Sequence, residues 1–215
     1  MISELLGLVL PAHCAGCGAP GGPVCPACGA LLHRRPCRAG RAWAMTAYRG
    51  PVRSMIVEYK DRGRSGLAAP LARALASVIT EGVLPEAAVR GGVLLIPVPS
   101  ARRSVRRRGG DTMLGLARLA AAELRSQGID AAALGVLRRM PGTPDQGDLG
   151  GAQRRTNLNG ALRATGAVSG TVIVVDDVTT TGASVAAAWS ALTSAGAHVV
   201  GAATVAAARL DTDKP

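Results

Sequence analysis

The segment 172–184 combines acidic, hydroxyl and glycine residues in an order that suits an anionic ligand with free hydroxyl groups. A Val- and Ile-rich run predicts a strand buried on both faces, and Asp176 and Asp177 follow at its carboxyl end, where carboxylates can accept hydrogen bonds from sugar hydroxyls. The small residues that come next allow backbone N–H groups to converge at the start of a helix, which makes an anion site. The alternative is an acidic turn before a capped helix that binds no ligand.

Four cysteines near the N-terminus have the spacing of a metal site, C-x2-C-x7-C-x2-C. Each pair can turn around one ion, and together they give the four thiolates of a tetrahedral structural zinc site. The proposed zinc ligands are Cys14, Cys17, Cys25 and Cys28. The alternative is four reduced thiols without metal, and His13 and His33 are substitute ligands that four cysteines make unnecessary. Cys37 stands alone.

The composition favours an anionic partner without identifying it. A net charge of +11 suits either nucleic acid or a phosphorylated small molecule, but four aromatic residues are too few for a platform that stacks single-stranded bases. The apolar run 2–10 is too short for a membrane helix and has no preceding basic stretch, so we expect a cytoplasmic protein without membrane insertion.

Strand and helix patterns alternate along most of the chain, which predicts a mainly parallel sheet covered by helices. In such sheets, ligands bind beyond the carboxyl ends of the strands. We expect a small zinc module at 1–40, an α/β domain at 41–215 and a lid or binding loop at 141–160. The predicted strands are 42–48, 93–98, 171–175 and 198–205, and the predicted helices lie around 52–60, 67–80, 112–127 and 183–195.

Segment 172–184 resembles the motif that binds phosphoribosyl pyrophosphate (PRPP) in type I phosphoribosyltransferases. The resemblance implies that Asp176 and Asp177 act in catalysis and hold the ribose 2′- and 3′-hydroxyls. It also implies that the loop after them wraps the 5′-phosphate, through Thr179, Thr180, Thr181, Gly182, Ala183 and Ser184.

Nearly the whole chain resembles the ComF family of bacterial competence-associated proteins. The shared features, in chain order, are the cysteine pairs, Tyr48-Arg49-Gly50, Val52-Arg53, Tyr59-Lys60, Ile96 to Ser100, Arg108-Gly109, Gln146, Arg154-Arg155 and Asn157. The resemblance implies a type I phosphoribosyltransferase fold, with a mainly parallel central sheet and flanking helices, preceded by a small N-terminal zinc knuckle.

The resemblance also assigns residues to the pyrophosphate and to a lid. The turn Val98, Pro99 and Ser100 would contact the pyrophosphate, and Arg108 would neutralise it as a third catalytic residue. The lid contacts would be Gln146, Arg154 and Arg155. The alternatives are a solvated basic face or a nucleic-acid backbone contact for the arginine run, and a solvent-facing helix start at Arg154-Arg155.

One segment departs from the ComF pattern. The family usually continues Arg-Gly with Phe-Asn-Gln, whereas this chain has Gly110, Asp111 and Thr112 there. The change removes an apolar anchor and places a carboxylate near the proposed pyrophosphate. Elsewhere, we interpret Lys60 as a complement to a helix C-terminus and His198 as a core histidine.

The resemblance implies Mg²⁺ bound with PRPP, and transfer of the phosphoribosyl group to an unidentified amine or base. Two alternatives stay open: a DNA-uptake protein that contacts single-stranded DNA or a helicase partner, and a regulator that senses PRPP or nucleotides. The sequence indicates neither the acceptor nor the oligomeric state.

Overall fold

The structure is a computed structural model that describes residues 13–87, 89, 91–100, 110–140 and 161–211. Several residues named above lie outside the described residues: the apolar run 2–10, Arg108, and the proposed lid contacts Gln146, Arg154 and Arg155.

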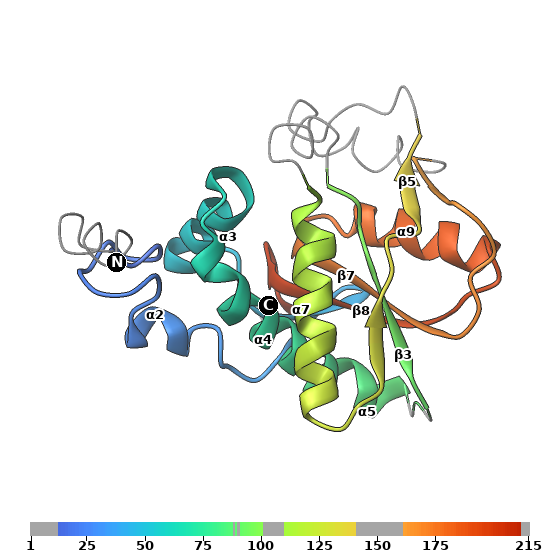
Figure 1. Ribbon diagram of the computed structural model, residues 1–215, viewed down its shortest axis with the longest axis horizontal. Coiled ribbons are helices and arrows are strands. Elements are labelled where there is room, and N and C mark those ends of the chain that lie inside the picture. The colour runs from blue at the N-terminus through green and yellow to red at the C-terminus, as the bar shows by residue number, and fades with distance from the viewer. Residues whose placement is uncertain (1–12, 88, 90, 101–109, 141–160, 212–215) are drawn as a thin grey trace, which may run out of the picture.

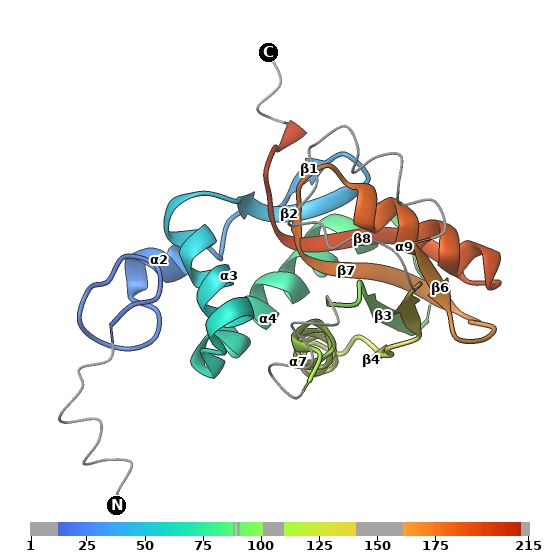
Figure 2. The ribbon, with the colours of Figure 1, turned by 90° about the horizontal axis from the view of Figure 1, so that it is seen from above.

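A six-stranded sheet forms the centre of the protein (Figure 1), and its strand order is β1-β2-β8-β7-β3-β4 (Figure 2). Its strands are β1 (Cys37–Ala39), β2 (Ala42–Ala47), β3 (Val93–Pro97), β4 (Ala131–Ala133), β7 (Thr171–Thr179) and β8 (His198–Ala207). Only the β1–β2 pair is antiparallel, and every other neighbouring pair in this sheet is parallel. A separate antiparallel pair joins β5 (Leu137–Arg139) and β6 (Leu162–Ala164). The predicted mainly parallel α/β sheet is confirmed.

Helices cover both faces of this sheet, with α4 and α7 on one side and α9 on the other (Figure 2). The helical segments are α2 (Pro26–Ala30), α3 (Gly50–Arg62), η1 (Ser65–Leu67), α4 (Ala68–Val78), the π-helix η2 (Ile79–Val83), α5 (Leu84–Ala87), α7 (Thr112–Ser126) and α9 (Ala183–Ser194). All four predicted helices are present, and they end within a few residues of the predicted bounds.

Strand β7 separates the two apolar cores because its side chains alternate between the faces. Ile173 and Val175 belong to the core under α4 and α7, whereas Val172 and Val174 belong to the core under α9. All four are fully buried. The uninterrupted apolar run therefore forms a strand covered on both faces. The expectation that Asp176 and Asp177 follow this strand is wrong, because β7 continues through both residues, which are buried, as far as Thr179.

The run Ser65–Ala87 is long and apolar enough to cross a membrane by length and composition, and it is the only such run in the described part of the chain. More than half of it is buried inside the protein, where α4 packs against α7 and β8. Its apolar character is therefore explained by the core of this fold.

The interpretation of His198 as a core histidine is wrong. His198 is the first residue of β8 and is exposed, because the apolar cover of that strand begins only further along, at Ala202. The apolar pattern of a strand does not reveal which of its ends projects beyond the covering helices.

Candidate functional site: a cleft at the carboxyl ends of β3 and β7

A cleft of about 460 Å³ lies where β3 and β7 end, as expected for a parallel sheet. Most of its lining comes from the end of β7 and the loop into α9, the turn after β3, and α3, and Tyr48, Met113 and Arg139 complete it. Val98 N donates to Val175 O at 2.9 Å, which holds the turn after β3 beside the end of β7. The topology thus brings together the two segments that the sequence assigned to one ligand.

Asp176 and Asp177 are both buried, and Lys60 supplies the positive charge that faces them. Lys60 Nζ lies 2.6 Å from Asp177 Oδ2. The Asp177 backbone N–H donates to Asp176 Oδ1 at 2.9 Å, and the Val178 N–H donates to Asp177 Oδ1 at 2.8 Å. The pair therefore sits in a network that already satisfies part of its hydrogen-bonding capacity.

Burial and the neighbouring charges shift the pKa values of both Asp176 and Lys60. Burial of Asp176, together with the neighbouring charge of Asp177, raises the pKa of Asp176 well above its usual range. Burial lowers the pKa of Lys60, but the charges of Asp177 and Asp176 outweigh that effect and raise it above its ordinary value. Lys60 is therefore held as a cation, while Asp176 is a carboxyl group that keeps its proton to unusually high pH.

The loop from β7 into α9 provides the proposed phosphate site. Thr180 and Thr181 are exposed, and Gly182 at the N-cap of α9 has φ 75°, a left-handed conformation that favours glycine. The N-cap Gly182 has no side chain to cap α9, and Thr181 Oγ1 accepts from the Ala183 N–H at 3.4 Å, so an anion bound here would meet the Thr181 hydroxyl and the first N–H groups of the helix. All of the residues assigned to the 5′-phosphate, Thr179 to Ser184, line the cleft.

The turn after β3 is fixed by the residue that departs from the ComF pattern. Asp111 is the N-cap of α7, and its side chain accepts from the backbone N–H groups of Met113 and Leu114. It also accepts from Ser100 Oγ at 2.8 Å and from the Ser100 N–H at 3.4 Å. Asp111 therefore caps a helix and positions the proposed pyrophosphate turn, and it is not itself among the residues that line the cleft.

Lys60, Asp61, Tyr48 and Arg139 also line the cleft, and the sequence did not assign them to it. Arg139 Nε donates to Pro99 O at 3.2 Å, which joins β5 to the pyrophosphate turn. Lys60 does occupy the last turn of α3, but its ammonium contacts Asp177, so its interpretation as a helix-end complement alone is wrong. Tyr59 Oη donates to Thr112 O, which docks α3 against α7 and so helps to place the neighbouring Lys60. The Tyr59-Lys60 pair was the feature of the sequence that could have assigned Lys60 to the cleft.

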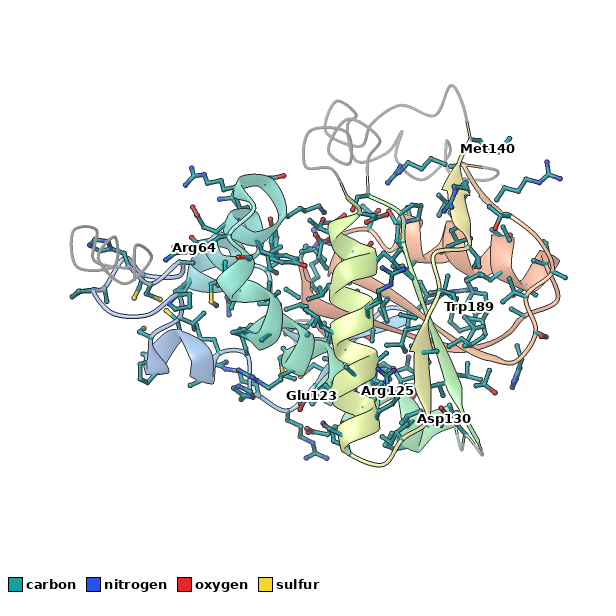
Figure 3. The ribbon with its side chains drawn as sticks, viewed as in Figure 1. Arg64, Glu123, Arg125, Asp130, Met140 and Trp189 are labelled. Carbon is teal, nitrogen blue, oxygen red and sulfur yellow. The ribbon has the colours of Figure 1, made fainter. Side chains whose placement is uncertain are left out.

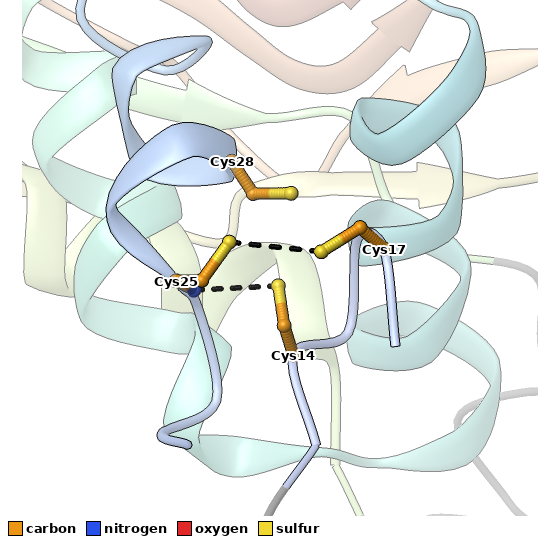
Figure 4. Close-up of side chains that lie close together, drawn as sticks. All are labelled: Cys14, Cys17, Cys25 and Cys28. Carbon is orange, nitrogen blue, oxygen red and sulfur yellow. Dashed lines mark hydrogen bonds between the residues drawn. The ribbon is translucent and has the colours of Figure 1, made fainter. Parts of the chain in front are cut away.

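The side chains of the four cysteines converge on one another (Figure 4). Their Sγ atoms all lie within 4.8 Å of one another, and Cys17 Sγ is 3.6 Å from Cys25 Sγ. Zinc–sulfur bonds of about 2.3 Å in a tetrahedron separate the sulfurs by about 3.8 Å. The four ligands therefore fit one Zn²⁺ with no open position.

Backbone N–H groups already favour a thiolate at Cys14. The Gly16 and Cys25 N–H groups donate to Cys14 Sγ at 3.4 and 3.3 Å. Burial alone raises the pKa of Cys14, but these donors outweigh it and lower the pKa to about 6. Burial raises the pKa of Cys28 instead, and its neighbour thiols raise it further. Cys14 is therefore favoured as a thiolate before a metal binds, whereas Cys28 needs the charge of a bound metal to lose its proton.

The cysteine segment is packed against α3 and the turn that follows it. Cys14 and Cys28 belong to the same apolar core as Val52 and Met55 of α3. Beyond the other end of the helix, the Arg64 guanidinium (Figure 3) donates to His13 O. The segment thus holds the helix that carries Lys60.

Comparison with known proteins identifies the fold family. The model of the phosphoribosyl transferase domain family matches residues 103–215, more than half of the chain. No curated protein matches the chain. Within the matched region lie β7, the acidic pair and the loop into α9, with β3 and its turn just before it. The chain belongs to the phosphoribosyl transferase domain family.

Proposed function

We propose that this protein binds PRPP in the cleft at the end of β7 and transfers its phosphoribosyl group to an amine or base. The observation that carries the proposal is the buried acidic pair next to the Gly182-capped N-terminus of α9, inside a matched phosphoribosyl transferase domain. Carboxylates select ribose hydroxyls and the helix start selects the 5′-phosphate, so the cleft suits both ends of a ribose phosphate.

The ribose hydroxyls would take over acceptor positions that Lys60 now occupies on Asp177. The displaced ammonium would then lie close to the negative charge of the incoming ligand. Val98, Pro99 and Ser100 would contact the pyrophosphate, helped by the cation of Arg139 in the same cleft. Arg108, Gln146, Arg154 and Arg155 stay predicted contacts of the pyrophosphate and lid.

The reaction would be a displacement at the anomeric carbon. The bond from that carbon to the pyrophosphate oxygen breaks with its electron pair on the oxygen, and the acceptor nitrogen forms the new bond and then loses a proton. Asp177 would stabilise the positive charge that develops on the sugar, and Asp176 would hold a ribose hydroxyl beside it. Mg²⁺ bound with PRPP would neutralise pyrophosphate charge, and the oxygen ligands of the cleft fit such a hard cation.

We further propose that the chain belongs to the ComF branch, with a zinc knuckle at 1–40 that serves folding and an α/β domain at 41–215. Support comes from the converged cysteines and from the cleft contacts of the Tyr59-Lys60 and Val98 to Ser100 motifs. The pairing of β1, which begins at Cys37, with β2 joins the last residues of the first unit to the sheet of the second.

Release of pyrophosphate from PRPP and Mg²⁺, in the presence of ammonia or each nucleobase in turn, tests this function. We expect release that depends on one acceptor and that is lost in Asp176→Asn/Asp177→Asn. The exposed Arg118 on α7 provides a control, because Arg118→Gln changes a charge away from the cleft. Saturable PRPP binding without release for any acceptor would contradict transfer and would favour a PRPP-sensing regulator.

A further inference from the structure

A second hollow, of about 630 Å³, lies at the other end of the sheet from the PRPP cleft. It is lined by the β1–β2 turn, by the first residues of β8, and by side chains from α5 and α9. The cleft stands at the carboxyl end of β7, whereas β2 and β8 begin beside this hollow, and both strands run parallel to β7. Its volume falls within the range of about 300–1,000 Å³ that small-molecule sites span.

Both tryptophans of the protein line this hollow, and each is covered by an arginine. The Arg38 guanidinium lies 5.1 Å from the centre of the Trp43 ring, and the Arg41 guanidinium lies 5.8 Å from the centre of the Trp189 ring. Such pairs present stacked flat surfaces, and a nucleobase stacks on an indole or on a guanidinium plane.

The two arginines differ in their charge partners. Arg38 pairs with Glu86 at 2.5 Å, and Glu86 also accepts from Trp43 Nε1 at 3.4 Å. Arg41 has no acidic partner among the described residues, and its guanidinium lies over the Trp189 ring. Within the described part of the chain, the hollow therefore offers one fixed flat surface and one cation without an acidic partner, which suits a phosphate.

The backbone beside the hollow packs closely against the Trp43 indole and restricts the movement of that ring. A Cβ added at Gly82 would lie 2.8 Å from the Trp43 ring, and one at Gly201 would lie 2.4 Å from Val83 Cγ1. Gly82 and Val83 belong to the π-helix η2, a distortion that occurs often at functional sites. Because Gly82 and Gly201 have no Cβ, η2 packs directly against Trp43 and against β8 beside the hollow.

We propose that this hollow is a second ligand site, which takes a nucleoside 5′-phosphate: the base stacks on the guanidinium plane of Arg38, which Trp43 and Glu86 hold in place, and Arg41 binds the phosphate. The inference does not rest on the proposed transferase activity, because the hollow and the cleft share no residue in the described part of the chain. It assigns a role to the two tryptophans and to Arg41 that the PRPP cleft leaves without one.

Tryptophan emission gives a direct test, since every tryptophan of the chain lines the hollow and none lines the cleft. We would titrate the full-length protein with adenosine 5′-monophosphate and follow its emission, with equilibrium dialysis of the labelled nucleotide as a second readout. We expect saturable binding with a change in emission. Arg41→Gln, which keeps both tryptophans, should weaken it at least tenfold, while Arg118→Gln should leave it unchanged.

Further titrations distinguish binding in the hollow from binding in the cleft or to a nucleic-acid strand. Asp176→Asn/Asp177→Asn should retain the binding, and loss of binding in that variant would place the nucleotide in the cleft and overturn the inference. Ribose 5-phosphate, which lacks the base, should bind the hollow at least tenfold more weakly. Equal effects of Arg41→Gln and Arg118→Gln, no binding by dialysis, or binding of oligothymidylate but not of the mononucleotide would each overturn it.

Discussion

The cysteine cluster and the PRPP cleft both bury ionisable groups, but they balance those groups differently. Cys14 Sγ is held by neutral backbone N–H groups and faces three other sulfurs, whereas Asp177 faces the ammonium of Lys60. The cluster therefore needs an added cation to ionise fully. The cleft already contains its own cation, which a ligand can displace.

This difference fits the proposals that a metal contributes to folding in the first region and that a ligand is exchanged in the second. Helix α3 connects them, because its first residues pack on the cysteine segment and its last turn carries Lys60. Loss of order at the cysteine cluster should therefore weaken ligand binding in the cleft, whereas loss of a ligand from the cleft should leave the cluster intact.

The largest expected effect is from removal of the metal site. Cys14→Ser/Cys28→Ser should lose stoichiometric zinc and lower the melting temperature by about 6–15 °C, because metal binding and folding of such a cluster are coupled. It should also weaken PRPP binding through α3. Cys37→Ser is the matched control. A double variant that melts like the unaltered protein would show that the cluster contributes nothing to the fold.

Removal of Lys60 should have the next largest effect. Lys60→Met leaves the buried Asp177 without its cation and should cost about 1–2 kcal/mol of unfolding free energy, at the low end for such pairs because Lys60 is partly exposed. Arg62→Met removes the exposed ion pair with Glu58 on the same helix and should cost less than about 0.5 kcal/mol. Equal costs in urea unfolding would contradict the difference drawn between the two pairs.

Asp176 should destabilise the protein in a pH-dependent way. Because its pKa is raised in the folded state, the folded protein holds this proton when the unfolded chain has lost it, so stability falls as pH rises above about 4. Asp176→Asn cannot ionise and should therefore be more stable than the unaltered protein at pH 7, with almost no difference between the two at pH 3. Melting curves of both proteins across this range measure the gain, and a pH-independent difference would contradict the assignment.

The smallest effect concerns the turn after β3. Asp111→Ala removes the N-cap of α7 and the acceptor of Ser100, and should cost about 1 kcal/mol. The free energy of PRPP binding should fall by more than the free energy of unfolding, because the turn at Ser100 loses its hydrogen bonds to Asp111. Thr112→Ala, next to it, keeps the cap and provides the comparison, since the contact of Tyr59 is with the Thr112 backbone oxygen. Equal losses of stability and of PRPP affinity in the two variants would contradict the positioning role of Asp111.

Local patterns made much of this fold predictable. The apolar run before Asp176, the Thr-Gly loop and the cysteine spacing each act within about a dozen residues, and each is where the sequence placed it. Lys60, Arg139 and the Arg41–Trp189 pair meet their partners across long stretches of chain, so no short pattern reveals them. The role of Asp111 also depends on tertiary contact, because a residue that breaks the ComF pattern holds Ser100 through its side chain.

The most direct test of the central claim is calorimetric titration of the zinc-loaded protein with PRPP and Mg²⁺, beside Asp176→Asn/Asp177→Asn. The account predicts saturable binding to the unaltered protein and its loss in the folded double variant. Equal binding in both proteins, or no binding to the folded unaltered protein, would contradict the assignment of the cleft at the end of β7 to PRPP.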